Sequence, residues 1–197
     1  MDTRTPCLRV ILGLGNPGPR YRDTRHNLGY RVVDRLGKRW NLRLRRKELT
    51  RVAFHHWRGQ RVILAKPALF MNESGLAADF ISRSYRCSPG EFLILMDDTV
   101  LPLGALRVRK GGRDGGHRGL RSVLEMLNTE RVPRLRLGAS PVAPPGDLSR
   151  FVLERFESEE MAAVEKMVSA ATDCVEMILE RGLDVTMNEF NRKPVGT

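Results

Sequence analysis

Four polar side chains with complementary chemistry lie at predicted junctions between strands, turns and helices. They are an imidazole, a carboxylate and two amides, at His26, Asp97, Asn16 and Asn72. A histidine with an ordinary pKa of about 6.5 takes a proton from water near neutral pH. A carboxylate behind it fixes the ring tautomer, and amides hold a carbonyl and its developing oxyanion. The set is typical of attack by water on a labile acyl group such as an ester.

Each of these residues also has an ordinary structural interpretation. A lone histidine such as His26 is more often structural than catalytic. Asn72 would usually be a helix N-cap, and Asp97 or Asp98 a turn or N-cap acid after a buried strand. No serine or cysteine resembles an activated nucleophile, and no spacing of histidine, cysteine and aspartate suits a metal. The sequence therefore predicts a water nucleophile, with neither a metal nor a cofactor.

The glycine-rich segment near the N-terminus has a competing interpretation. Residues 13–18 read GLGNPG and match the dinucleotide-binding pattern G-x-G-x-x-G directly after a predicted strand. That fold also needs an acid about 20 residues later, at the end of a second strand. Here this distance falls near Asp34, within a helical pattern, and Pro17 removes a backbone N–H that would face a pyrophosphate. A nucleotide-dependent enzyme is therefore the more distant alternative.

Predicted strands alternate with predicted helices along the chain, which indicates an α/β fold. Strands are expected at residues 8–12, 51–57, 60–65, 92–96, 106–109 and 135–137. Helices are expected at residues 24–40, 74–85, 120–127 and 158–181, the last capped by Ser158, and a proline-rich loop at residues 141–146. A hairpin around residues 58–59 makes the sheet mixed. Residues 1–197 show no repeat and no linker, so we expect a single domain.

The expected topology gathers the polar residues at one edge of the sheet. In open α/β sheets, sites form at the carboxyl ends of the strands. Asn16 follows the first strand, Asn72 follows the hairpin, and Asp97 follows the apolar run at residues 92–96. We therefore expect these three side chains to lie near one another.

The charge of the chain points to a polyanionic partner. The formal net charge is +11, and residues 1–51 hold 14 Lys/Arg against 4 Asp/Glu, whereas residues 158–197 hold 4 against 8. Arginine predominates over lysine, which favours forked contacts to phosphate. An arginine-rich genome is the alternative explanation of this composition.

Three further features indicate a protein of a reducing compartment. No apolar run approaches the roughly 20 residues that span a bilayer. The opening residues, MDTRTPC, contain an acid and no apolar core, so a signal peptide is not expected. Cys7, Cys87 and Cys174 are odd in number and scattered, as expected of reduced and mostly buried thiols.

Several motifs in consistent order carry a family resemblance. They are LGNPG at 14–18, Tyr21, TRHNLG at 24–29, KP at 66–67, FMNESG at 70–75, DD at 97–98, LPLG at 101–104, GGHRGL at 115–120, RLRLG at 134–138 and FVL at 151–153. Together they resemble the signatures of the bacterial-type peptidyl-tRNA hydrolases, from about residue 8 to residue 191. An arginine, Arg118, stands where that family usually has an asparagine that binds substrate near the catalytic water.

The resemblance implies a monomeric, cytoplasmic α/β enzyme whose twisted, mostly parallel mixed sheet is surrounded by helices. It implies hydrolysis of the ester between a peptide and the 3′ end of tRNA. His26 would be the general base and Asp97 its orienting carboxylate, chosen over Asp98 by its distance from Pro102. Asn16 and Asn72 would position the carbonyl and the water.

The resemblance also implies a set of residues that bind peptidyl-tRNA. These are Tyr21, Asn27, Met71, Arg107, Arg109, Gly115, Arg118 and Arg136. Arg107, Arg109 and Arg136 would clamp the 5′ phosphate of the acceptor stem, although charged residues on an edge strand also have a purely protective role. The rival function is that of an RNA-binding relative that kept the fold and lost hydrolysis.

Overall fold

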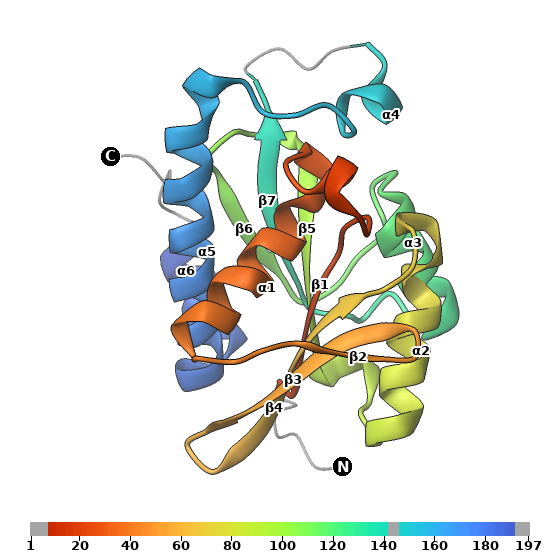
Figure 1. The fold of residues 1–197 in the computed structure, drawn as a ribbon. Coiled ribbons are helices and arrows are strands. Elements are labelled where there is room, and N and C mark those ends of the chain that lie inside the picture. Colours follow the sequence, from red (N-terminus) through yellow and green to blue (C-terminus); the bar gives the residue numbers. More distant parts are fainter. Residues whose placement is uncertain (1–7, 142–145, 192–197) are drawn as a thin grey trace.

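The computed structural model describes residues 8–141 and 146–191. These residues contain one seven-stranded sheet with the strand order β2-β3-β4-β1-β5-β7-β6 (Figure 1). The strands are β1 (Val10–Gly13), β2 (Arg45–Lys47), β3 (Thr50–Trp57), β4 (Gln60–Pro67), β5 (Phe92–Pro102), β6 (Leu106–Arg109) and β7 (Arg134–Ser140). Strands β4, β1, β5 and β7 pair in parallel, and the outer strands pair antiparallel. The predicted mixed sheet with a mostly parallel core is confirmed.

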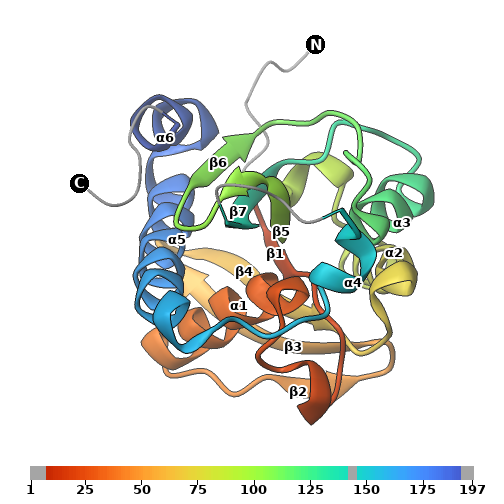
Figure 2. The same cartoon turned by 90° about the horizontal axis from the view of Figure 1, so that it is seen from above.

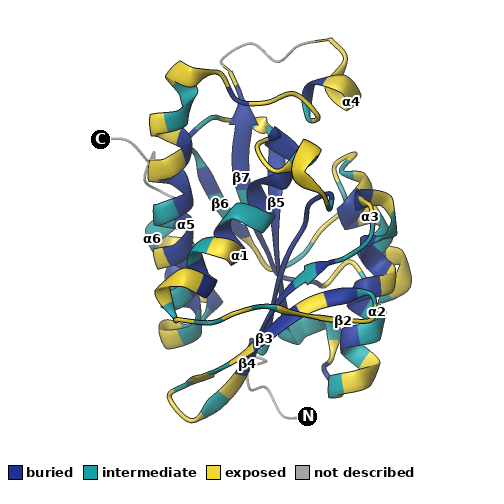
Figure 3. Cartoon of the chain, viewed as in Figure 1, coloured by how far each residue is buried: buried dark blue, intermediate teal, exposed yellow. Residues whose placement is uncertain are grey.

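The parallel centre of the sheet is buried on both faces. Every residue of β1 is buried, as are Phe92 to Asp98 of β5. This explains the continuous apolar runs in the sequence, because helices cover both faces of a parallel sheet. Figure 3 shows the buried residues concentrated in the central strands and on the helix faces turned toward them.

Six α-helices occur in the described residues and form two layers. They are α1 (Leu28–Arg39), α2 (Ser74–Tyr85), α3 (Arg118–Met126), α4 (Leu148–Phe151), α5 (Met161–Arg181) and α6 (Leu183–Phe190). Helices α1, α5 and α6 pack on one face around one apolar cluster, and α2 and α3 pack on the other face around a second cluster. Figures 1 and 2 show these layers, with α4 near the ends of the central strands.

A pair of glycines brings α1 against the central strands. A Cβ atom on Gly29 would lie 2.3 Å from the carbonyl oxygen of Leu95, and one on Gly13 would lie 2.3 Å from the carbonyl oxygen of Gly29. Both contacts are far shorter than van der Waals distance, so only glycine allows this approach. The close packing places the residues just before α1, including His26, beside the end of β5.

Several predicted boundaries differ from the structure. The helix expected at 24–40 begins with a 3₁₀ turn, Arg25–Asn27, before α1. The last long helix is preceded by the 3₁₀ turn Ser158–Glu160, and its capping box joins Glu157 and Glu160, so the predicted Ser158 cap is wrong. Strand β5 continues past Asp97 to Pro102 because it keeps pairing with β7. Strand β2 and helices α4 and α6 were not predicted.

The remaining expectations concern cysteines, the proline-rich loop and membranes. Cys87 and Cys174 are buried free thiols, as predicted. Cys7 and residues 142–145 of the proline-rich loop lie outside the described residues. Among the described residues, no helix is both long and apolar enough to cross a membrane.

Candidate active site

A cleft of about 720 Å³ opens at the carboxyl ends of the central strands, between α3, α4 and the segment that precedes α1. Most of the residues singled out by the sequence line it: Asn16, Tyr21, His26, Met71, Asn72, Asp97, Arg109, Gly115, Arg118 and Arg136. Two do not line it, Asn27 and Arg107. The gathering of Asn16, Asn72 and Asp97 follows from the parallel order of β4, β1 and β5.

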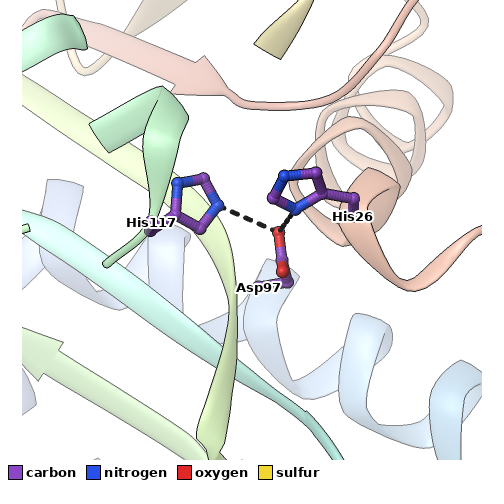
Figure 4. A group of neighbouring side chains, drawn as sticks. All are labelled: His26, Asp97 and His117. Atoms are coloured by element: carbon purple, nitrogen blue, oxygen red, sulfur yellow. Dashed lines mark hydrogen bonds and ion pairs between the residues drawn. The ribbon is translucent and has the colours of Figure 1, made fainter. Parts of the chain in front are cut away.

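Two histidines share one carboxylate oxygen at the base of the cleft (Figure 4). Asp97 Oδ1 lies 2.8 Å from His26 Nδ1 and 3.1 Å from His117 Nε2. The imidazole rings of His26 and His117 are 4.8 Å apart and tilted by 52°. His117 belongs to one of the sequence motifs but was not among the predicted site residues, because it lies in a glycine-rich stretch without periodicity.

The hydrogen bonds assign the tautomer of each ring. His117 Nδ1 accepts the backbone N–H of Leu120 at 3.1 Å, so the ring proton is on Nε2 and is donated to Asp97. His26 donates its Nδ1 proton to Asp97. The lone pair on Nε2 of His26 is then available as a base, in the arrangement by which a carboxylate orients a catalytic imidazole.

Asp97 is held in its ionised form despite being only 1% exposed. Burial alone would raise the pKa of this carboxyl group. Attraction to His26 and His117, together with the hydrogen bonds from both rings, outweighs burial and places the pKa well below its ordinary value. The carboxylate therefore stays charged throughout the neutral range and keeps His26 in one tautomer.

The same three side chains are also a geometric candidate for a metal site. One possible ligand atom from each of His26, Asp97 and His117 lies within 4.8 Å of the other two, a cluster that sequence spacing did not predict. A histidine ring binds a metal only through an unprotonated nitrogen. The backbone N–H of Leu120 occupies His117 Nδ1 and so keeps the proton on Nε2. The geometry therefore favours a chain of hydrogen bonds over a metal centre.

The side chain of Asn16 is oriented by two neighbours. Its Oδ1 accepts the backbone N–H of Met71 at 2.8 Å. Asn27 holds the backbone of Asn16 from both sides, accepting its N–H at 2.8 Å and donating to its carbonyl at 3.0 Å. Because Oδ1 is engaged, the side-chain NH₂ group of Asn16 is the donor presented to the cleft. Asn27 thus supports the site from behind without lining it.

Asn72 lies at the rim of the cleft, not at a helix cap. It occupies the middle of the 3₁₀ turn Met71–Glu73, which precedes α2, and neither that turn nor α2 has a side-chain cap hydrogen bond. The N-cap interpretation is therefore wrong. The side chain of Asn72 is exposed and can turn toward a bound carbonyl or water.

The basic residues of β6 and β7 differ in their surroundings. Arg136 forms an ion pair with Asp98, and Asp98 also accepts the N–H of Val100 at 2.8 Å. Arg107 lies directly opposite Arg136 in the sheet but does not reach the cleft. Arg109 is exposed and lines the cleft. Of the three arginines, Arg109 is thus the most available to an anion in the cleft.

A further arginine, Arg134, was not among the residues predicted to form the site. It also lines the cleft, is 2% exposed and donates to the carbonyls of Val132, Gly112, Arg113 and Glu130. These bonds tie β7 to the glycine-rich loop that leads to His117. Its role in the structure is to hold that loop in place.

The segment around His26 is fastened to the chain that follows α4. The backbone N–H of His26 donates to Val152 at 2.8 Å, and that of Arg25 donates to Glu154 at 3.1 Å. The Arg25 guanidinium is only 5% exposed, pairs with Glu160 at 2.6 Å, and stacks over the ring of Phe156. These contacts fix the position of His26 from outside its own element.

Tyr21, Gly115 and Arg118 complete the lining of the cleft. Tyr21 meets Phe70 edge-on, with ring centroids 6.1 Å apart. Gly115 has a positive φ of 60°, a conformation that suits glycine, and leads into the N-terminus of α3. Arg118 is the first residue of α3 and is exposed at the cleft.

Comparison with known proteins identifies relatives over almost the whole chain. The family model described as peptidyl-tRNA hydrolase matches residues 10–196. A peptidyl-tRNA hydrolase of Methylacidiphilum infernorum is 40% identical over 184 residues, covering 92% of this chain and 97% of that protein. One of Chloroflexus aurantiacus is 43% identical over 186 residues, covering 92% and 98%.

Solved structures agree with these sequence matches. The peptidyl-tRNA hydrolase of Acinetobacter baumannii, known from a crystal structure, is 28% identical in sequence and superposes with a TM-score of 0.90. The match covers 99% of this chain and 100% of that protein. The family model, the relatives and the solved structures all identify the same family. The chain belongs to the peptidyl-tRNA hydrolase family.

Proposed function

We propose that this protein hydrolyses the ester between a peptide and the 3′ end of tRNA. Membership of the family supports this function, and one observation carries it at the level of chemistry. His26 donates Nδ1–H to the buried carboxylate of Asp97 and so presents Nε2 as a base, beside the amide of Asn16. Among the described residues that line the cleft, Ser149 is the one serine and its hydroxyl has no hydrogen bond to a histidine, so we take water as the nucleophile.

In the first step, water attacks the ester carbonyl and transfers a proton to His26 Nε2. The resulting imidazolium is stabilised by Asp97, which already accepts the proton on Nδ1. The NH₂ group of Asn16 donates to the developing oxyanion, and Asn72 holds the carbonyl or the water. Neither step needs a metal ion.

In the second step, the tetrahedral intermediate collapses and the C–O bond to the ribose breaks. His26 returns its proton to the leaving ribose oxygen, which gives free tRNA and a peptide with a new carboxyl group. Base and acid are thus the same side chain in turn, and the enzyme returns to its starting state.

The tRNA half of the substrate meets the basic rim of the cleft. Arg109 and Arg136 bind the 5′ phosphate of the acceptor stem, while Tyr21, Met71, Gly115 and Arg118 contact the 3′ end. Arg107 stands next to Arg136 and adds to the field without direct contact. The enzyme acts as a monomer in the cytoplasm, where it recycles tRNA for translation.

The alternative is an RNA-binding relative without hydrolysis. Such a protein would not need the buried Asp97 or the oriented amide of Asn16, and both are present with their supporting contacts. The observations therefore favour the enzyme.

The test is release of N-acetylated amino acid from charged tRNA by the purified protein. The unmodified protein should release it, and His26→Ala should lower kcat by about two or more orders of magnitude. Binding of uncharged tRNA by His26→Ala should be nearly unchanged, which separates lost chemistry from lost binding. A folded His26→Ala protein with near-normal turnover would exclude this mechanism.

A further inference from the structure

A second cavity, of about 520 Å³, lies on the other side of the loop that carries Asn16. It is bounded by residues 16–19, by one side of α1 and by β2, β3 and the end of β4. Seven cationic side chains line it against three acids: Arg22, Arg31, Arg35, Lys38, Arg46, Arg51 and Lys66 against Asp23, Asp34 and Glu165. We call this cavity the basic groove.

Three of its cations form a row across neighbouring strands. Arg46 of β2 lies directly opposite Arg51 of β3, and Arg51 lies directly opposite Lys66 of β4. Residues that face each other across strands lie on the same side of a sheet, about 5 Å apart. Like charges in such positions repel one another and weaken the sheet. Within the folded chain alone, the row is unfavourable.

Only part of the charge in the basic groove is compensated by the protein. Arg31 and Arg35 share Glu165, and Lys66 pairs with Asp34 at 2.6 Å. Arg46 and Arg51 are exposed and, within residues 8–141 and 146–191, form no ion pair. The middle and the outer end of the row are therefore open to an external anion.

We propose that the basic groove binds backbone phosphates of the tRNA, at a surface separate from the arginines of β6 and β7. This inference rests on the proposed function, which places a tRNA at the neighbouring cleft. The two cavities share Asn16 and lie on either side of residues 16–19. Guanidinium groups such as those of Arg46 and Arg51 fit phosphate with two parallel hydrogen bonds.

A nucleic acid fits this surface better than an acidic peptide does. The peptide part of the substrate differs in sequence from one molecule to the next, so its charge varies. The phosphate backbone is present in every substrate, and only a partner that is always negative offsets a permanent row of cations. Contacts to backbone phosphates carry no sequence information, so the binding is sequence-independent.

The position of the basic groove sets it apart from the arginines of the cleft. Strands β2, β3 and β4 form one edge of the sheet, and β7 and β6 form the other, with β1 and β5 between them. Neighbouring strands are about 4.8 Å apart, so β3 and β6 are separated by roughly 24 Å. Two anion-binding surfaces at that distance can contact different parts of one tRNA.

The experiment compares the double variant Arg46→Ala/Arg51→Ala with the control Arg43→Ala/Arg45→Ala. The control removes two exposed arginines from the same segment, and neither of them lines the groove. KM is measured as a function of salt for N-acetyl-aminoacyl-tRNA and for the same group on a CCA trinucleotide. Direct binding of uncharged tRNA is measured by fluorescence anisotropy.

With the full tRNA, the groove variant should raise KM by about tenfold at low salt, whereas the control should not. The slope of log KM against log salt concentration should fall by about one or two in the groove variant and stay the same in the control. The ratio of KM for the trinucleotide to KM for the full tRNA should fall accordingly. Equal values for the groove variant and the control would overturn the proposal. So would an effect that persists with the trinucleotide and grows with acidic residues in the peptide, since that would identify the peptide as the occupant.

The anisotropy measurement separates this inference from the proposed function. If the unmodified protein hydrolyses neither substrate, the proposed function fails, and loss of tRNA affinity in the groove variant still supports the groove. If hydrolysis is normal and the affinity of the groove variant equals that of the control, only the inference about the groove fails.

Discussion

Two neighbouring aspartates in β5 show how strand geometry separates roles. Successive side chains of a strand point to opposite sides. Asp97 consequently meets His26 and His117, while Asp98 meets Arg136. The sequence alone placed both acids at the same turn and distinguished them only by motif spacing. The structure assigns the histidine contact to Asp97.

Replacing each aspartate by asparagine should therefore change different kinetic constants. Asp97→Asn removes the charge that stabilises the imidazolium and should lower kcat by about one to three orders of magnitude with little change in KM. Asp98→Asn should leave kcat within a few-fold and change KM, because it frees Arg136. Steady-state kinetics on both variants check this, and a larger loss of kcat in Asp98→Asn would reverse the assignment.

The lowered pKa of Asp97 also predicts a pH dependence of stability. In the unfolded chain this carboxyl takes up a proton near pH 4, whereas in the folded protein it does so at lower pH. Its stabilising contribution is therefore complete above about pH 4 and is lost as pH falls toward the folded pKa. The difference in unfolding free energy between the unmodified protein and Asp97→Asn should shrink by about 1 kcal/mol between pH 5 and pH 3.

Urea unfolding at the two pH values measures this difference directly. A constant difference between pH 5 and pH 3 would show that the hydrogen bonds from His26 and His117 do not hold the carboxylate in its ionised form.

At the scale of elements, His117 at the N-terminus of α3 both caps the helix and contacts the aspartate of the site. His117 is the N-cap of α3 through Nδ1 and donates to Asp97 through Nε2. A Cβ atom on Gly119 would lie 2.3 Å from Met71 Sδ, so glycine there lets α3 approach the residue that orients Asn16. The start of α3 thus supports both Asp97 and, through Met71, Asn16.

Two substitutions at His117 should separate these contributions. Asparagine is a good N-cap but is too short to reach Asp97, so His117→Asn should keep the melting temperature and lower kcat by several-fold. His117→Ala should lower kcat similarly and also destabilise the protein by about 1 kcal/mol. Equal kcat for His117→Asn and the unmodified protein would reduce His117 to a structural cap.

The elements that the sequence predicted well are those with a strong local signal. The apolar run at residues 92–96 predicted β5, and the boundaries of α2 agree with the predicted helix at 74–85. The second half of β5 begins with two aspartates and ends at Pro102, and its pairing with β7 shifts register between Asp98 and Pro102, so no local pattern marked it as a strand. Helix α6 follows Gly182 directly and has only a short apolar stripe.

The site could be predicted only in part, for a related reason. Residue types and motif order pointed to His26, Asp97, Asn16 and Asn72, all of which line one cleft. The interaction of His117 with Asp97 joins segments 20 residues apart, and the bond from Met71 to Asn16 joins segments 55 residues apart. Such contacts depend on tertiary packing, which periodicity does not report.

For the whole molecule, the structure shows where the unevenly distributed charge of the sequence lies and how much of it is paired. Part of the positive N-terminal portion is neutralised by the acidic α5, through pairs such as Arg39–Asp173 and Arg35–Glu165. Among residues 8–141 and 146–191, the cations left without an ion pair include Arg46 and Arg51 of the basic groove and Arg109 of the cleft. The partly internal pairing explains why net charge alone overstated the surface available to RNA.

Arg109 and Arg107 form a matched pair for testing the clamp in the cleft. Both lie on β6, but only Arg109 lines the cleft. Arg109→Ala should raise KM for peptidyl-tRNA by several-fold, flatten its salt dependence by about one unit of slope, and weaken the preference for a 5′-phosphorylated tRNA. Arg107→Ala should have the smaller effect on all three. Assays with phosphorylated and dephosphorylated tRNA provide the comparison.

The ion pair between Arg25 and Glu160 has a consequence for the synthesis of the protein on the ribosome. The two residues are 135 positions apart, and the backbone N–H of His26 donates to Val152, so the segment around His26 is secured partly by late parts of the chain. During synthesis, the growing chain is itself a peptide esterified to a tRNA. Because the ribosome releases the chain from its N-terminus onward, the contact between Arg25 and Glu160 forms only after residue 160 has emerged. For most of its synthesis the nascent protein is itself joined to a tRNA by an ester bond and lacks this contact beside His26.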